Sequence, residues 1–174
     1  MGCVSRPHKV NLIVGLLSSD AAILSQVKKH LERSYGPTDF ESPVMDFTHT
    51  EYYKAEMGEG LKRQFLSFKK MLDLSGIYAV KLKTNKLESR FLSGGNRTVN
   101  IDPGYLDDSK VVLFSTKDYT HRIYLDKGIH AEVTLFYKDR SYRPWPWTYP
   151  DYKTDAYIDI LNRIRQNYRT KKAC

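Results

Sequence analysis

The first half of the chain alternates between an apolar run and segments with helical spacing. Residues 10–17 are almost all apolar and lead into Ser18-Ser19-Asp20. A run of this length followed by turn-forming residues predicts a buried strand that feeds a helix. Ile23, Val27 and Leu31 then recur at every fourth position before Gly36-Pro37. This spacing predicts an amphipathic helix that ends near residue 36.

Two further elements are predicted before residue 77. A short strand is expected over residues 43–47. Apolar residues at helical spacing then mark a second amphipathic helix, at Leu61, Phe65, Phe68 and Leu72. Glycines at positions 58 and 60 weaken its first turns, so we expect it to start loosely near residue 51.

Between residues 77 and 137 the hydrophobic period changes from 3.6 to two, which is typical of strands. Turn-forming residues return at short intervals at positions 85–86, 94–96, 102–104, 118 and 126–128. We predict an antiparallel meander of about five strands, with Pro103 and Gly104 at the centre of a type II turn. Residues 78–83 form one of its strands.

The end of the chain returns to helical spacing. Its apolar positions are Tyr157, Ile160, Leu161, Ile164 and Tyr168, and they predict a closing helix. We therefore expect one α+β domain over residues 1–174, with an ordered core at about residues 10–169. It has a mainly antiparallel sheet, in the order β-α-β-α and then the five-strand meander, with about three helices on one face.

Composition agrees with one folded domain. The chain has 174 residues, of which 41% are hydrophobic and 28% charged. Its longest apolar run, residues 12–17, is far shorter than the roughly 20 residues of a membrane-spanning helix, so no membrane partner is expected. The two cysteines stand at positions 3 and 174, which excludes a disulfide framework and a thiolate metal cluster and favours a cytoplasmic protein.

The chain is basic, with a formal net charge of +8. Residues 138–174 contribute nine Lys or Arg and four Asp or Glu, so the excess lies towards the closing helix. A positive field attracts nucleic acid and small phosphorylated molecules, although most charged surfaces are only solvated. The arginines of the closing helix and the 13 tyrosines therefore support an RNA-binding module as an alternative function.

Strand alternation places a set of polar side chains on one face of the predicted sheet. In the segment 128–137 the apolar positions are odd-numbered, which leaves Glu132 and Thr134 on the other face. The same argument applied to the other strands completes the set with Lys81, Lys83, Asn100, Asp102 and Arg122. Such a face is either a solvated surface, a subunit interface of an oligomeric scaffold, or a concave binding site.

For the binding site, we expect a small anionic ligand. Lys81, Lys83, Lys117 and Arg122 would hold its anion, with Asn100 and Thr134 beside them. Asp102, Glu132 and His121 are the candidates for acid–base or positioning roles. The residues have no metal-ligand spacing, so no metal is predicted, and neither a cofactor nor a reaction follows from them.

Two other observations bear on function. Trp147, Tyr149 and Tyr152 either seal the core or stack on a base or sugar. The chain has no phosphate-binding P-loop, no glycine-rich dinucleotide motif, no zinc-protease motif, no Cys-x-x-Cys and no Gly-x-Ser-x-Gly. The corresponding enzyme classes are unsupported.

Taken together, several segments resemble a known family. They are residues 100–106 (NIDPGYL), 116–117 (TK), 121–125 (HRIYL), 132–135 (EVTL) and 147–152 (WTYPDY), with residues 14–17, 56–58 and 83–85 in matching order. Over residues 10–169 the chain is similar to the prokaryotic family of unknown function numbered 4416. The resemblance implies an intracellular single-domain protein and carries no activity with it.

Overall fold

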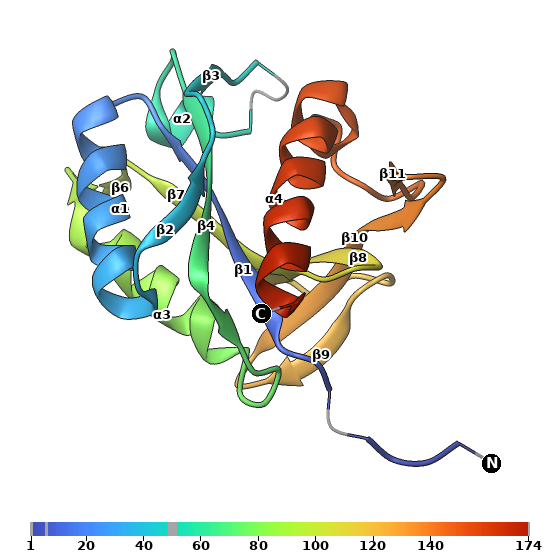
Figure 1. The fold of residues 1–174 in the computed structure, drawn as a ribbon. Helices are drawn as coiled ribbons and strands as arrows, with labels where there is room; N and C mark the ends of the chain where they lie inside the picture. Colours follow the sequence, from blue (N-terminus) through green and yellow to red (C-terminus); the bar gives the residue numbers. More distant parts are fainter. Residues whose placement is uncertain (1, 6, 49–51, 174) are drawn as a thin grey trace.

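The structure is a computed structural model that describes residues 2–5, 7–48 and 52–173. Its centre is a nine-stranded sheet in which the main path runs β11-β10-β8-β7-β1-β4-β2, with β3 on β4 and β9 on β10 (Figure 1). The strands are β1 (Val10–Ser18), β2 (Thr38–Glu41), β3 (Met45–Asp46), β4 (Lys62–Leu72), β7 (Asn100–Leu106), β8 (Lys110–Ser115), β9 (Ile123–Asp126), β10 (Ile129–Lys138) and β11 (Ser141–Pro144). The paired strands are antiparallel.

The remaining elements surround this sheet. A small hairpin joins β5 (Leu92–Ser93) to β6 (Asn96–Arg97). The helices are α1 (Ala21–Tyr35), α2 (Lys54–Met57), α3 (Ala79–Glu88) and α4 (Asp155–Ala173), with 3₁₀ turns η1 (Ser89–Phe91) and η2 (Asp151–Lys153). The α+β class, the mainly antiparallel sheet and the closing helix are confirmed. No helix in the described part of the chain combines the length and the apolar character needed to cross a membrane.

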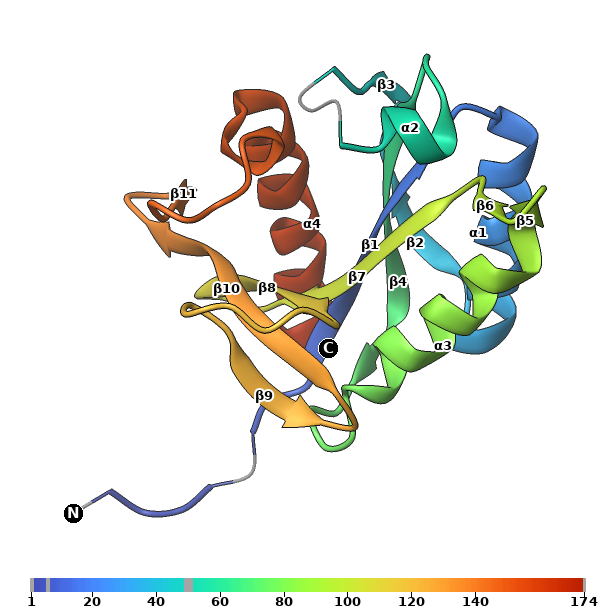
Figure 2. The same ribbon diagram turned by 180° about the vertical axis from the view of Figure 1, so that it is seen from behind.

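The central strand β1 is buried on both faces. Leu12, Val14 and Leu16 pack into the core beneath α1 and α3, whereas Ile13 packs into the core beneath α4. Figures 1 and 2 show α1 and α3 on the side of the sheet opposite α4. The expectation of helices on one face is therefore wrong, and the unbroken apolar run of β1 follows from burial on both sides.

The segment predicted as the second helix is strand β4. It pairs with β1, so that Phe65 lies opposite Gly15. Phe65 packs beneath α4, and its neighbour Leu66 packs beneath α1 and α3. A strand that is buried on both faces has apolar residues at both odd and even positions, so it lacks the alternation of apolar and polar residues. The apolar residues of β4 matched helical spacing by chance. Residues 49–51, where that helix was placed to begin, lie outside the described residues.

The strand predicted over residues 78–83 is instead part of helix α3. Val80, Thr84 and Leu87 are its buried stripe, at spacings of four and three residues. Leu82, which strand alternation placed with Val80, is 37% exposed. Lys81 and Lys83 therefore lie on helix α3 and not on the polar face of the sheet, where they were predicted.

The predicted turn at Pro103 and Gly104 is also wrong, because both residues lie inside strand β7. β7 pairs with β1 along its whole length, from Asn100 to Leu106, but with β8 only from Gly104 onward. Proline has no backbone N–H and cannot donate a hydrogen bond to a neighbouring strand. It is therefore tolerated in a strand at a position where no neighbouring carbonyl requires that donor. At Pro103 the strands β7 and β8 therefore separate, and a cavity opens between them.

Candidate functional site

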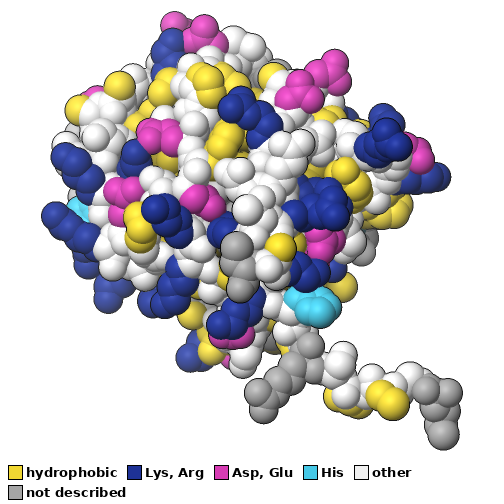
Figure 3. All heavy atoms as spheres, viewed as in Figure 1, with side chains coloured by type: hydrophobic (Ala, Val, Ile, Leu, Met, Phe, Trp, Pro, Cys, Tyr) yellow, Lys and Arg dark blue, Asp and Glu magenta, His cyan; other side chains and the backbone are white. Residues whose placement is uncertain are grey.

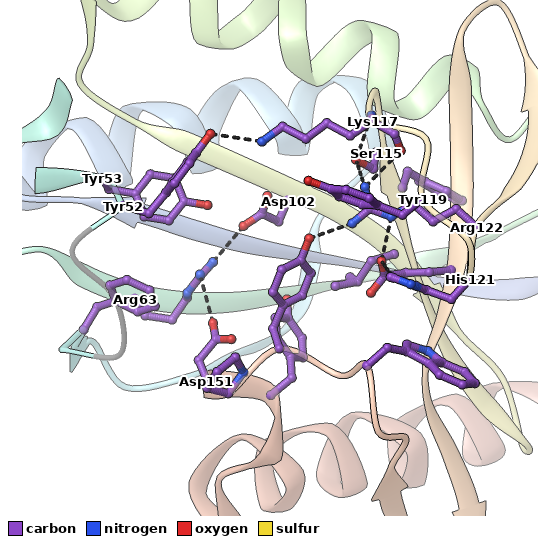
Figure 4. A pocket seen from close by; sticks show the side chains of 18 residues that line it. Tyr52, Tyr53, Arg63, Asp102, Ser115, Lys117, Tyr119, His121, Arg122 and Asp151 are labelled. Carbon is purple, nitrogen blue, oxygen red and sulfur yellow. Dashed lines mark hydrogen bonds and ion pairs between the residues drawn. The ribbon is translucent and has the colours of Figure 1, made fainter. Parts of the chain in front are cut away.

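The cavity has a volume of about 590 Å³ and lies on the α4 face of the sheet (Figure 4). Its charged lining residues are Arg63, Asp102, Lys117, Arg122, Glu132 and Asp151. Aromatic rings make up much of the remainder, including Tyr52, Tyr53, Tyr119, His121, Trp147 and Tyr149. These residues come from β4, β7, β8, β10, η2 and the connections between them, so that no single segment forms the site.

Arg63 on β4 forms one charged centre of the cavity. Its Nη1 donates to Asp102 Oδ2 at 3.1 Å, and its Nη2 donates to Asp151 Oδ2 at 3.3 Å. The Arg63 side chain is only 2% exposed. Burial opposes its charge, but Asp102 and Asp151 outweigh this effect and raise the pKa of Arg63 above its usual value. Arg63 is thus a permanent cation held by two carboxylates.

Asp102 is the member of this centre with access to solvent. Its side chain is 28% exposed. Burial by itself would raise the pKa of Asp102, but Arg63 and Lys81 outweigh it, so the pKa lies below the usual value. An ionised carboxylate at the cavity wall accepts hydrogen bonds from ligand hydroxyl or amine groups.

The second charged centre is the buried pair of Arg122 and Glu132. The two side chains are 1% and 2% exposed, and Arg122 Nε donates to Glu132 Oε2 at 2.8 Å. Arg122 Nη1 donates to Ser115 Oγ and to the carbonyl of Lys117, each at 2.9 Å, while Nη2 donates to Tyr149 Oη at 2.6 Å. With its donors engaged in this way, Arg122 fixes the shape of the cavity wall.

His121 lies between this pair and the aromatic wall. Its Nε2 is 3.2 Å from Glu132 Oε2, which favours the tautomer with a proton on Nε2 and leaves Nδ1 as an acceptor. The imidazole stacks between Tyr119 and Trp147, with ring centroids 6.0 and 5.7 Å away. Trp147 stacks in turn on Trp145 at 5.1 Å. The ring of His121 is therefore oriented both by a carboxylate and by stacking.

Lys117 is held more loosely at the rim. Its Nζ donates to Tyr52 Oη at 3.0 Å, as Figure 4 shows, and lies 4.9 Å from the ring centroid of Tyr52. The hydrogen bond from Lys117 lowers the pKa of the Tyr52 hydroxyl. An ammonium group carries three donors, so Lys117 is able to bind a ligand oxygen in addition to Tyr52.

The structure brings together five of the predicted site residues, namely Asp102, Lys117, His121, Arg122 and Glu132. The other four do not line the cavity. Thr134 donates to Glu132 Oε1 at 3.2 Å and supports it from behind. Asn100 accepts from Arg97 at 3.0 Å, Lys81 donates to the carbonyl of Ile101 at 3.0 Å, and Lys83 lies on α3 across the sheet.

Sequence reasoning missed two charged residues of the site. Arg63 was overlooked because its segment was interpreted as a helix, and Asp151 because its segment was considered only for its aromatic rings. A signal for the strand was present in the apolar and aromatic positions Phe65, Leu66 and Phe68, which flank both cores. Of the three aromatic residues weighed as a plug or a stacking surface, Tyr152 is buried, whereas Trp147 and Tyr149 are 41% and 45% exposed.

The arginines of α4, on which the RNA-binding alternative rests, have partners within the domain. Arg165 Nε donates to the carbonyl of Asp108 at 2.9 Å, and its guanidinium lies 3.4 Å from the ring centroid of Tyr137. Arg169 lies 3.8 Å from the Asp108 carboxylate. Arg163 lies over the ring of Phe40 at 5.3 Å. These contacts reduce the positive charge that α4 presents to a partner.

The cavity also has no evident metal site. Within residues 2–5, 7–48 and 52–173, no three His, Cys, Asp or Glu side chains are grouped closely enough to hold a metal ion. Each carboxylate of the cavity instead faces a guanidinium group.

Comparison with known proteins identifies the family of the chain. No curated protein and no solved structure matches it. A family model described as a domain of unknown function, DUF4416, matches residues 8–168, which include every residue of the cavity. The chain therefore belongs to the DUF4416 family.

Proposed function

We propose that the protein binds a small phosphate-bearing, nucleotide-like molecule in the cavity between β7 and β8. The observation that carries the proposal is the combination of a cavity of about 590 Å³ with an aromatic wall and a rim lysine, Lys117, whose ammonium group donates to one side chain among the described residues. A volume of this size lies within the range of roughly 300–1,000 Å³ of small-molecule sites.

The charges of the cavity favour a ligand with one anionic group. Arg63 is held by Asp102 and Asp151, and Arg122 is held by Glu132, so neither guanidinium is left to hold a polyphosphate. Among the described residues, the ammonium group of Lys117 donates only to Tyr52. A single phosphate at Lys117 therefore matches the charge that the wall can balance.

The aromatic wall favours a ring in the same ligand. Tyr149 is 45% exposed, and its hydroxyl accepts from Arg122 Nη2 at 2.6 Å, which fixes the position of its ring. Trp147 stacks on both His121 and Trp145 and so supports the wall rather than a ligand ring. A preorganised aromatic face stacks on a base with little loss of entropy. Asp102 and the Nδ1 atom of His121 would then accept hydrogen bonds from the ligand.

The other two candidate functions have less support. An RNA-binding surface requires a continuous basic patch, whereas Figure 3 shows acidic and basic side chains interspersed over the face that carries α4. A scaffold interface requires the polar face to be flat enough to pair with a partner, but three of the charged residues predicted for it, Asp102, Arg122 and Glu132, line a cavity instead.

The test is a binding titration with guanosine, adenosine and uridine 5′-monophosphates, ribose 5-phosphate and inorganic phosphate. The two tryptophans of the chain, Trp145 and Trp147, are stacked on each other at the cavity, so their fluorescence reports on its occupancy. We expect at least one nucleotide to bind with a Kd below about 1 mM. Calorimetry confirms that the fluorescence change reflects binding.

Variants connect this binding to the cavity. Lys117→Gln should weaken nucleotide binding at least about tenfold, the loss of one charge-assisted contact. Lys138→Gln removes the same charge from an exposed position outside the cavity and should leave binding unchanged. Absence of binding by all five compounds, or equal binding by wild type and Lys117→Gln, contradicts the proposal. Binding of oligouridylate that Arg163→Gln/Arg169→Gln abolishes would favour the RNA alternative.

A further inference from the structure

A second cavity lies between α1 and α3, on the face of the sheet opposite the first. Its volume is about 190 Å³. Helix α1 contributes His30, Leu31, Ser34 and Tyr35, and α3 with the following turn contributes Lys83, Thr84, Lys86, Leu87 and Arg90. Figure 2 shows the two helices side by side. Neither the family nor the proposed function accounts for this cavity.

The charge of this second cavity is of one sign. Lys83, Lys86 and Arg90 line it, and no Asp or Glu does. Among the described residues, none of the three has an ion-pair partner within 4.0 Å. This contrasts with the first cavity, where each guanidinium faces a carboxylate.

The spacing of these cations brings them onto one side of α3. Lys83 and Lys86 are three residues apart, and Lys86 and Arg90 are four apart, so they are neighbours on a helix surface. Like charges at these spacings destabilise a helix. Lys86 lies in the last turn of α3, where the helix dipole stabilises a cation. Lys83 lies one turn earlier, so the dipole does not offset the repulsion that it experiences.

A buried hydroxyl lies behind the wall of this cavity. Among the described residues, the hydroxyl of Tyr35 has no hydrogen-bond partner, and the ring of Tyr35 lies 6.0 Å from Lys83 Nζ. Burial raises the pKa of Tyr35 to about 12, so this hydroxyl keeps its proton at neutral pH. A buried unsatisfied donor is costly unless something accepts from it.

We propose that the cavity between α1 and α3 binds the phosphate groups of a small soluble molecule. Lys83 and Lys86 supply point charges, and Arg90 supplies a guanidinium fork. The volume of about 190 Å³ is smaller than that of most drug-sized sites and suits a diphosphate-sized group. The occupant would relieve the repulsion along α3.

The test is calorimetric titration of the full chain with inorganic pyrophosphate at low salt. The variant Lys86→Gln/Arg90→Gln should weaken pyrophosphate binding at least about tenfold relative to wild type. The matched control, Lys29→Gln/Arg33→Gln, removes one lysine and one arginine from exposed positions of α1 outside the cavity and should change the Kd less than about twofold.

Tyr35→Phe tests whether the charges alone account for binding. It removes only a hydroxyl that the surrounding side chains enclose, so we expect the Kd for pyrophosphate to stay within about twofold of wild type. Because Lys117 belongs to the first cavity, Lys117→Gln should leave pyrophosphate binding intact. This variant separates a failure of the present proposal from a failure of the proposed function.

Three results would overturn the inference. The first is an absence of pyrophosphate binding by the wild type. The second is equal weakening by both double variants, which would indicate a response to net charge alone. The third is tight binding of oligouridylate through Lys86 and Arg90 without binding of pyrophosphate, which would show that the cavity between α1 and α3 binds a nucleic-acid backbone.

Discussion

Gly15 on β1 lies directly opposite Asp102 on β7, and the space above Gly15 is occupied by the guanidinium of Arg63. A Cβ at position 15 would lie 3.0 Å from Arg63 Nη1 and 3.3 Å from Tyr152 Oη. The missing side chain therefore allows a cation from one neighbouring strand to reach a carboxylate on the other. Gly15 has an ordinary strand conformation, but its lack of a side chain makes room for the contact between Arg63 and Asp102.

Gly15→Ala is expected to lower the free energy of unfolding by about 1–3 kcal/mol, because the methyl group lies 3.0 Å from Arg63 Nη1 and shifts this buried guanidinium away from Asp102 and Asp151. Urea denaturation measures this. An unchanged unfolding midpoint would show that Arg63 is not confined as described.

Asp102→Asn should lower the free energy of unfolding at pH 7 by about 2–4 kcal/mol, because the buried Arg63 keeps only Asp151 as a counter-ion. Asp73→Asn, at an exposed position, is the matched control and should cost less than about 0.5 kcal/mol. Comparable losses in the two variants would contradict a specific role for Asp102.

The effect of Asp102→Asn should also depend on pH. The pKa of Asp102 is lower in the folded protein than in the unfolded chain, where it is about 3.9. Its stabilisation is then fully present above the unfolded value and is lost as the pH falls through the folded value. The difference between wild type and variant, measured by urea denaturation, should stay constant from about pH 7 to 5 and shrink below about pH 4.

Glu132→Gln should lower the free energy of unfolding by about 3–5 kcal/mol, because Arg122 is left charged and buried. The double variant Arg122→Met/Glu132→Leu removes both charges and should recover part of that loss. Glu59→Gln, in an exposed ion pair, should cost less than about 1 kcal/mol. Together with the single variants Arg122→Met and Glu132→Leu, the double variant completes a double-mutant cycle, in which additive losses would show that the two buried charges do not stabilise each other.

Gly104→Ala should be more damaging than Gly15→Ala. A Cβ at position 104 would lie 2.2 Å from the backbone carbonyl of Val112, so β8 itself has to move. We expect the free energy of unfolding to fall by more than about 3 kcal/mol, or the soluble yield to fall. The soluble yield and the urea midpoint, measured for both alanine variants, show which of the two is more destabilising.

Local patterns were sufficient for elements that bury one face. Helix α1 was predicted from Leu31 and its apolar partners and ends at Tyr35 before Gly36, and α4 was predicted from the stripe that includes Ile160 and Ile164. An amphipathic helix carries its own periodicity, so such elements can be located without knowledge of their neighbours.

The same patterns failed where both faces of an element are buried or where pairing partners are distant. Phe65 and Phe68 on β4 face different cores, so their spacing matched a helix. Pro103 and Gly104 fit a turn by local chemistry, and only the pairing of β7 with β1 requires them to be extended. Residue propensity is overridden there by contacts that are remote in the sequence.

The sequence by itself determined an α+β fold with a closing helix, and strand alternation singled out Asp102, Arg122 and Glu132 as residues that point away from the core. The tertiary structure alone decided which charges meet: Arg63 contacts Asp102 and Asp151 across 39 and 88 residues of chain. It also moved Lys83 to the opposite face of the sheet. The physical reason is that strand register depends on packing between segments that are distant in the sequence, as does the position, Gly104, at which β7 begins to pair with β8. Side-chain periodicity does not encode such packing.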